Sequence, residues 1–248
     1  MATTLNRGVG MLVAACVAVA ALGAPGTAGA AKSTKSDRQI ARAGLFVAGD
    51  IPSSWQAATK PTPDDKSFDR LTRKTPSCAP TVKGRAALQK GTAAKSVDFT
   101  LAPDTMNDQV WVLDRVGDAT KAFAQLADES VSVCYTEALD QLFTTELASA
   151  SLQDVDVRVR KSPLLPTADG RTIGDEAFIL AVAVRIVPTS GATQTVSVIS
   201  IFARTGSAIT NYVLGSEPTS TGQFSNATYS AFLGAVQAAA DRLRAAQA

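Results

Sequence analysis

The sequence of 248 residues contains no histidine. Histidine is the base of Ser-His-Asp and Cys-His catalytic sites, and its imidazole is a common ligand of bound metals. Its absence therefore excludes those nucleophilic mechanisms and every metal site that needs an imidazole. The chain also lacks a phosphate-binding glycine loop and a metal-ligand cluster, so we predict no cofactor and no metal.

The chain also has no large excess of positive or negative charge. Lysine and arginine number 24 against 22 acidic residues, a formal net charge of +2. Such a balance creates no long-range field that would attract nucleic acid or an anionic membrane, so we predict no nucleic-acid partner. With 46% hydrophobic residues, 17 Gly and 11 Pro, the composition is that of a folded globular protein.

The first thirty residues differ from the rest of the chain. Arg7 is the only charged residue in this segment, and residues 9–22 form an apolar run rich in Ala and Val. Helix-breaking Gly and Pro residues follow, and then the small-residue triplet at 28–30. This order is typical of a secretory signal peptide, and the apolar run is shorter than the ~20 residues that span a bilayer. We predict cleavage after Ala30 and a secreted, envelope-associated protein.

A second interpretation of the same segment is a lipid anchor. Residues 13–16 read Val-Ala-Ala-Cys, which resembles a bacterial lipobox with Cys16 as the lipidated residue. The apolar run continues beyond Cys16 to Leu22, however, whereas a lipobox normally ends such a run. We expect membrane attachment only if Cys16 is lipidated.

Two cysteines remain after the signal peptide, Cys78 and Cys134. In an exported protein such a pair most simply forms one disulfide, the alternative being two free thiols. The bridge would close a loop of 56 residues, for which chain entropy gives about 4 kcal/mol of stabilisation. Neither cysteine lies in a C-x-x-C motif, which argues against a redox-active dithiol.

We predict a linker over residues 31–36 and one α+β domain over residues 37–248. In the first half, Asp37 is expected to cap a short helix that reaches Leu45. The expected elements that follow are a proline-containing loop over 57–82, strands over 97–101 and 110–116 joined by 103–108, and helices from Asp118 to Cys134 and over 139–147, with a break near 135–137.

The second half is predicted to consist of strands followed by one helix. The strands are expected near 155–159 and over 177–187, 193–204 and 208–214, and the helix begins near Asn226. Short connections between the strands imply antiparallel neighbours in a meander. The predicted fold is thus an antiparallel sheet of about six strands with helices packed on it.

The order of these features resembles a known family. The stretch GDIPSSW at residues 49–55 fits a loose D-[LI]-P-x-x-W pattern, a cysteine follows it, and Gly174-Asp175 precedes the meander. This is similar to the secreted and lipoprotein sensor domains of actinobacterial envelopes, which include the extracellular domain of PknH-type receptor kinases. The resemblance implies a non-catalytic ligand-sensing domain with a cleft. The kinase domains carry two disulfides and this chain can form one; it also shows no kinase domain, so another protein would relay the signal.

Three arginines stand out as candidate ligand-binding residues. Arg115, Arg185 and Arg204 each lie in, or at the end of, an otherwise apolar predicted strand. On one shared face their guanidinium groups would bind a phosphate, sulfate or carboxylate. The alternative is that each extends from the sheet edge or pairs with an acidic residue, the nearest in sequence pattern being Asp98, Asp114 and Glu176.

Aromatic residues provide candidate walls for a cleft. Trp55, Trp111, Tyr135 and Tyr212 could serve in this way, because binding sites combine aromatic walls with a few polar groups. Trp111 lies between two valines and is expected in the core. Trp55 follows a proline in a loop and is the better candidate, and Tyr212 is kept beside it.

Acidic pairs allow one catalytic hypothesis. Asp64 with Asp65, or Asp154 with Asp156, could act as acid and base in a carboxylate-based hydrolase. Arg158 and Arg160 continue the second pattern, however, which favours a solvated charged strand face. The sequence Asn-Ala-Thr at 226–228 matches a glycosylation acceptor but fits helix capping better in a bacterial protein.

We therefore predict an exported, non-enzymatic binding or sensor-like domain of the bacterial cell envelope. Its partner is expected to be a small molecule or an envelope protein. The alternatives are a structural or protein-binding envelope protein without a small-molecule site and, third, the hydrolase. A lipid carrier would need a large apolar cavity between sheet and helices.

Overall fold

The computed structural model describes residues 35–62, 67–147, 152–164, 171–189 and 191–248. The predicted signal peptide, Cys16, most of the predicted linker and the pair Asp64-Asp65 lie outside these ranges. No helix in the described ranges is both long and apolar enough to cross a membrane.

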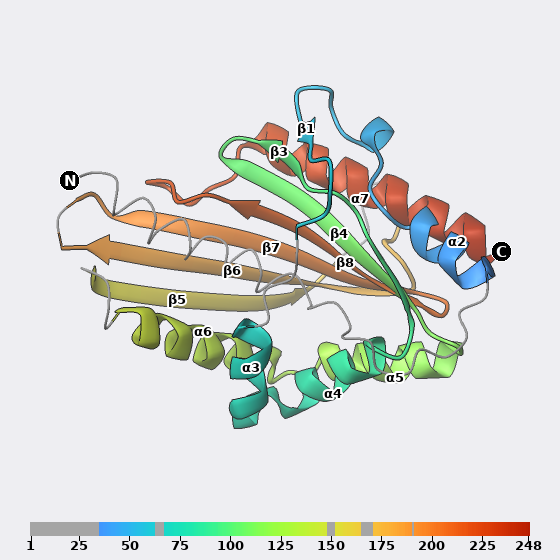
Figure 1. The fold of residues 1–248 in the computed structure, drawn as a ribbon, viewed down its shortest axis with the longest axis horizontal. Coiled ribbons are helices and arrows are strands. Elements are labelled where there is room, and N and C mark those ends of the chain that lie inside the picture. The colour runs from blue at the N-terminus through green and yellow to red at the C-terminus, as the bar shows by residue number, and fades with distance from the viewer. Residues whose placement is uncertain (1–34, 63–66, 148–151, 165–170, 190) are drawn as a thin grey trace.

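An antiparallel sheet of eight strands forms the centre of the molecule (Figure 1). Its strands follow the order β1-β3-β4-β8-β7-β6-β5, and β2 pairs with β4 beside β3. The strands are β1 (Gln56–Ala57), β2 (Thr92–Lys95), β3 (Phe99–Leu101), β4 (Asp104–Val112), β5 (Leu152–Pro163), β6 (Glu176–Pro188), β7 (Gln194–Thr205) and β8 (Ala208–Ser216). Strands β5 to β8 form the predicted meander, each paired with the next in sequence. The α+β prediction is confirmed, with more strands than the six expected.

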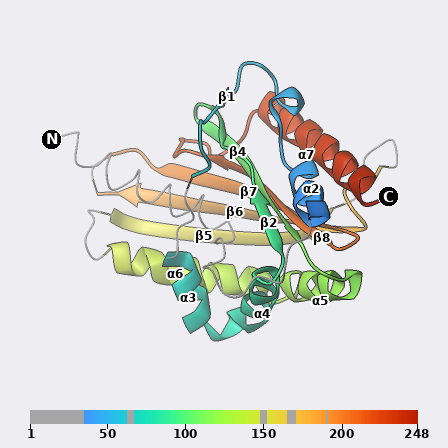
Figure 2. The same ribbon diagram turned by 45° about the vertical axis from the view of Figure 1, so that its right-hand side comes forward.

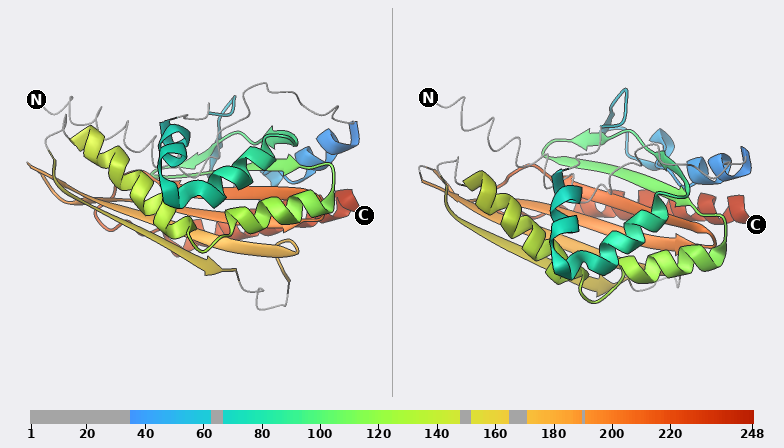
Figure 3. Two further views of the ribbon diagram at one scale, coloured as in Figure 1. Left: turned by 90° about the horizontal axis from the view of Figure 1, so that it is seen from below. Right: turned by 60° about the horizontal axis from the view of Figure 1, so that its bottom comes forward.

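Helices cover both faces of the sheet (Figures 2 and 3). Helices α3 to α6 lie on one side, while α2 and α7 lie on the other. The helices are α2 (Lys35–Ala43), α3 (Ser67–Lys74), α4 (Ala79–Leu88), α5 (Val116–Leu126), α6 (Val131–Leu147) and α7 (Asn226–Gln247), with short 3-10 helices η1 (Ala48–Asp50) and η2 (Pro76–Cys78).

The larger core lies between the sheet and helices α4 to α6. Trp111 is buried in it, as predicted. Phe178 stacks on Phe202 with ring centroids 4.9 Å apart and meets Phe123 of α5 edge-on at 5.6 Å. Because alternate residues of each strand point to the same face, the apolar residues of β6 and β7 supply most of this layer.

The second core lies under α7. Phe232 of α7 meets Phe46 edge-on at 6.3 Å, and Phe46 stacks on Tyr212 of β8 at 5.4 Å. The predicted apolar stripe of the C-terminal helix is thus the face that α7 buries. Ser225 caps α7 by accepting a hydrogen bond from the backbone N–H of Thr228 at 3.0 Å, so the cap stands one residue before the expected Asn226.

The segment over 57–82 was expected to be a loop, and this prediction is wrong for its second half. Helix α3, η2 and the start of α4 lie there. Pro76 and Pro80 stand in the first turns of η2 and α4, where proline favours a helix because its missing N–H would have no partner anyway. Arg85 of α4 then forms an ion pair with Asp69 of α3, which fastens the two helices together.

The expected connection over 103–108 is instead the first part of β4. Its polar residues suggested a turn, yet Asp104 and Asn107 are buried and each has a hydrogen-bond partner on another segment of the chain. The Thr228 hydroxyl donates to Asp104 at 2.8 Å, and the Asn107 amide donates to Asp98 at 2.9 Å. These contacts satisfy polar groups inside the fold that would otherwise favour an exposed turn.

The break between the two middle helices lies earlier in the chain than predicted. It lies between α5 and α6, before the expected 135–137. The Asp128 side chain accepts hydrogen bonds from the Ser130 backbone N–H at 2.9 Å and from its hydroxyl at 2.6 Å. This local turn ends one helix and starts the next, which places Cys134 in the first turn of α6 rather than at a helix end.

The N-terminal segment is fastened to the C-terminal helix. Helix α2 begins two residues before the expected cap at Asp37 and packs beside α7 (Figure 2). Arg242 of α7 donates to both carboxylate oxygens of Asp50 at 2.5 and 2.7 Å, and to the carbonyls of Ala43 and Leu45 at 3.3 and 2.7 Å. A single guanidinium thus joins residues about 190 positions apart.

Candidate functional site

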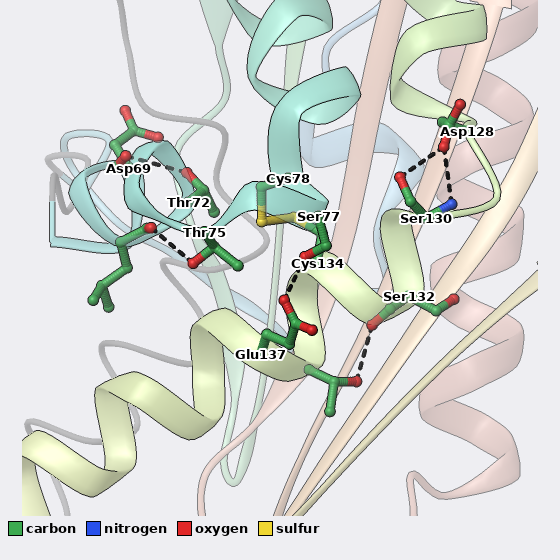
Figure 4. The surroundings of a disulfide bond; sticks show 12 residues. Asp69, Thr72, Thr75, Ser77, Cys78, Asp128, Ser130, Ser132, Cys134 and Glu137 are labelled. Atoms are coloured by element: carbon green, nitrogen blue, oxygen red, sulfur yellow. Dashed lines mark hydrogen bonds between the residues drawn. A yellow bond between two sulfur atoms is a disulfide. The ribbon is translucent and has the colours of Figure 1, made fainter.

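The disulfide predicted between Cys78 and Cys134 is present (Figure 4). Its Cα atoms are 4.6 Å apart and both cysteines are fully buried. It joins η2 to the first turn of α6. Beside it, the Ser77 hydroxyl donates to Glu137 at 2.6 Å. The bond therefore fastens the α3–η2–α4 segment to the longest helix on that side of the sheet, which is a structural role.

The three predicted arginines do not share a face. Arg115 is exposed at the N-cap of α5. Arg185 pairs across the sheet with Thr195, whereas Arg204 lies nine residues further along β7, a separation of about 30 Å at ~3.3 Å per residue. Arg204 is also nearly buried. It donates to Glu176 at 2.8 Å and to Asp175 at 3.0 Å, so the alternative interpretation, pairing with Glu176, holds for this residue.

The prediction that Trp55 and Tyr212 line a cleft is also wrong. Trp55 and Tyr212 are buried in the core under α7, and Tyr135 is buried on the opposite side of the sheet. Burial raises the pKa of the Tyr212 phenol. These rings stabilise the fold and line no open surface.

The acidic pair on β5 belongs to a charged strand face. Asp156 accepts from Arg158 at 2.8 Å, and Asp154 lies 3.7 Å from Arg185 of the neighbouring strand. Each carboxylate thus faces a guanidinium, and the arrangement is that of exposed ion pairs rather than of an acid and a base across a substrate. The other acidic pair, Asp64-Asp65, lies outside the described residues.

A different site lies on the sheet face that α7 leaves open. Helix α7 covers β8 and part of β7, while no helix of the described residues covers β5 and β6 on this side (Figure 1). An open groove of about 530 Å³ lies there, within the size range of small-molecule sites. We call it the β5–β7 groove. Its principal residues are Arg158, Arg160, Ala181, Ala183, Ile199, Phe224, Asn226 and Tyr229.

The strand register explains why a groove forms here. Arg160 of β5 stands opposite Ala181 of β6, and Arg158 stands opposite Ala183. Ala181 in turn stands opposite Ile199 of β7. Side chains directly opposite each other across a ladder are neighbours on one face. Two short alanines therefore form a low floor between two long arginines on one side and bulkier residues on the other.

The far wall is the segment that leads into α7, and the fold holds it in place. The Ser197 hydroxyl donates to the Gly222 carbonyl at 2.5 Å, and the Gly222 N–H donates to the Thr219 hydroxyl at 2.9 Å. Gly222 has a φ of +61°, and a Cβ at this position would overlap the Thr195 side chain. Only glycine fits this close approach without strain, so the wall has a defined position.

Among the described residues, the charged side chains that line the groove are Arg158 and Arg160, and Arg158 is paired with Asp156 beside it. Asn226 and Tyr229 belong to the first turn of α7, where unpaired backbone N–H groups carry partial positive charge, and no acidic side chain occupies that turn. Positive potential therefore reaches the groove from both walls, above an apolar floor.

Two smaller hollows differ in this respect. Each measures about 310 Å³. The one between α4 and α5 is lined by Lys90 and Lys121 together with Asp114 and Asp118. The one between α3 and α4 includes the Arg85 ion pair with its aspartate. The α4–α5 hollow is lined by equal numbers of basic and acidic residues, and both hollows are smaller than the β5–β7 groove, which we therefore take as the candidate binding site.

From the sequence alone, Arg158 and Arg160 are interpreted as part of a solvated strand face. No sequence pattern identified Ala181, Ala183, Phe224 or Tyr229 as binding-site residues. The available signal was the pair of small residues at i and i+2 of a strand otherwise rich in large apolar residues. Within the described ranges, no group of three or more Cys, Asp or Glu side chains could hold a metal ion.

Comparison with known proteins finds no relative. No family model matches the chain, and neither does a curated protein or a solved structure.

Proposed function

We propose that this protein is an exported, non-enzymatic binding domain of the bacterial cell envelope, and that the β5–β7 groove holds its ligand. The groove itself carries the proposal, since it combines adequate volume, a fixed wall and the guanidinium of Arg160 above an apolar floor. The signal-peptide pattern of residues 1–30 and the Cys78–Cys134 disulfide support export to an oxidising compartment.

The surroundings of the groove support binding rather than catalysis. The described residues that line it offer guanidinium, amide and phenol groups but no carboxylate that could act as a general acid or base. The acidic residues closest in the strand pattern, Asp154 and Asp156, face arginines. The resemblance to envelope sensor domains agrees with this assignment, and a sensor of this kind would pass its signal to another envelope protein.

Native mass spectrometry of the protein purified from its producing cells tests the proposal. We expect the wild-type protein to begin at residue 31, to contain one disulfide and to retain a bound small molecule; a lipid-modified protein that begins at Cys16 would show the alternative processing. The variant Ala183→Phe fills the floor of the groove and should lose that molecule. Ala245→Phe adds the same ring at an exposed position near the end of α7 and should retain it.

Three results would contradict the proposal. A wild-type protein without any bound molecule removes the ligand-binding function. Retention by Ala183→Phe equal to that of wild type moves the ligand elsewhere. Finding the protein in the cytoplasm, with an uncleaved N-terminus and with Cys78 and Cys134 as free thiols, removes the export assignment.

A further inference from the structure

We infer that the ligand of the β5–β7 groove is an anionic amphiphile, an acyl-chain-like molecule with a carboxylate or phosphate head group. The inference rests on the proposed function, because it assigns the ligand class of the same site. It follows from the way the groove separates charged walls from an apolar floor, as the following contacts show.

The head-group site centres on Arg160. Both arginines line the groove, but Arg158 already donates to Asp156 through Nε and Nη2, each at 2.8 Å, and 79% of its side chain is exposed. Arg160 forms no ion pair or hydrogen bond with any residue in the described part of the chain. Its guanidinium therefore keeps all five N–H donors for a ligand, in the planar arrangement that fits carboxylate and phosphate oxygens.

The opposite wall reinforces the preference for an anion. Asn226 stands in the first turn of α7, a helix of 22 residues. An anion lying between Arg160 and this turn would be attracted from both sides, since the helix start is positively polarised. A cationic head group at this place would meet the guanidinium of Arg160, and no acidic residue is among the described residues that line the groove, so the groove disfavours cations.

The rest of the groove is apolar. Ala181 and Ala183 form the floor, Ile199 continues it on β7, and the partly buried rings of Phe224 and Tyr229 stand beside it. These side chains form no closed cavity, so the ligand would lie along the sheet with one side in contact with water. An extended chain buries apolar area on such a surface more completely than a compact polar molecule does.

Binding of twelve-carbon probes tests the ligand class. Laurate, dodecyl phosphate, dodecanol and dodecylammonium share one chain and differ in the head group, and isothermal titration below their micellar concentrations gives the dissociation constants. We expect laurate and dodecyl phosphate to bind at least tenfold more tightly than dodecanol, because a charge-assisted hydrogen bond is lost in the alcohol. Dodecylammonium should bind more weakly still. The ratio of the two anions distinguishes a carboxylate ligand from a phosphate ligand.

Two arginine variants separate head-group binding from a structural effect. Arg160→Gln should weaken laurate binding about tenfold and leave dodecanol binding within twofold. Arg185→Gln removes an arginine from the same side of the sheet, outside the groove lining, and should change neither. Equal losses of laurate and dodecanol in Arg160→Gln would overturn the assignment of Arg160.

The outcomes separate the ligand class from the binding function. Equal affinity for all four probes, or tighter binding of dodecylammonium, overturns the anionic class. If no probe binds while wild-type protein retains a natural ligand that Ala183→Phe loses, the groove binds something else and only the ligand class is wrong. If no probe binds and no natural ligand is retained, both proposals fail.

Discussion

Asp108 is a buried carboxyl group whose ionisation we expect to control stability near neutral pH. It lies on β4 beneath the N-terminal segment, and its Oδ1 accepts a hydrogen bond from the backbone N–H of Phe46 at 3.0 Å. Its Oδ2 is buried without a hydrogen-bond partner in the described part of the chain. Burial raises the pKa of Asp108 from 3.8 to about 7, against the opposing effect of the Phe46 hydrogen bond.

The sign of the pH dependence follows from this raised pKa. Above pH 4 the unfolded chain ionises Asp108 while the folded protein keeps it neutral up to about pH 7. The stabilisation is therefore complete below pH 4 and is lost as the pH rises to 7. A difference of about three pKa units corresponds to about 4 kcal/mol. Nearby charges modify this only partly, since Arg242 of α7 lowers the pKa and Asp50 of η1 raises it.

Urea unfolding between pH 4 and pH 8 measures the effect. Asp108→Asn keeps the side-chain shape but does not titrate, so wild type should lose about 4 kcal/mol more than the variant over this range. Asp118→Asn, an exposed carboxyl group on α5, should follow wild type. Parallel curves for wild type and Asp108→Asn would refute the reasoning.

Three further changes test other parts of the fold. Replacing Cys78 and Cys134 by Ala should lower the free energy of unfolding by about 4 kcal/mol, measured by urea titration, from the 56-residue loop; an unchanged value would contradict a structural role for the disulfide. Arg242→Met leaves the buried Asp50 carboxylate without its guanidinium and should cost about 2–3 kcal/mol, measured by thermal unfolding. Gly222→Ala should cost about 1–3 kcal/mol, because a non-glycine residue is strained at positive φ; a neutral result in the same assay would show that the loop adjusts freely.

Regular side-chain patterns explain which parts of the fold could be predicted. The alternation in β5 and the short connections of the meander depend on neighbouring residues only, and so does the apolar stripe of α7. The disulfide could be predicted because only two cysteines follow the apolar run at residues 9–22. Trp111 could be placed in the core because both of its neighbours are apolar.

The errors arise where distant contacts override local preference. Asp104 and Asn107 look like turn residues, and only their bonds to Thr228 and Asp98 make them compatible with a strand. Pro80 looks like a helix breaker unless its position in the first turn is known. For Asp104 and Asn107 the partner residue decides the conformation, whereas for Pro80 the exact start of the helix does.

The groove could not be predicted for a related reason. Its shape depends on the register that sets Arg160 opposite Ala181, and on the place where the segment before α7 meets β7. Neither follows from the residues alone. The arginines chosen from the sequence stood out by charge within apolar strands, whereas Arg204 proved to be neutralised by two neighbouring carboxylates.

The contact of Arg242 with the N-terminal segment has a consequence for the order of folding. During synthesis, Phe46 and Asp50 emerge about 190 residues before the part of α7 that contacts them. Until that helix arrives, an apolar ring and a carboxylate destined for burial stay exposed to solvent and to other chains. The end of α7 thus completes the packing of the N-terminal segment. A chain truncated before residue 242 would lack the contact that joins its two ends.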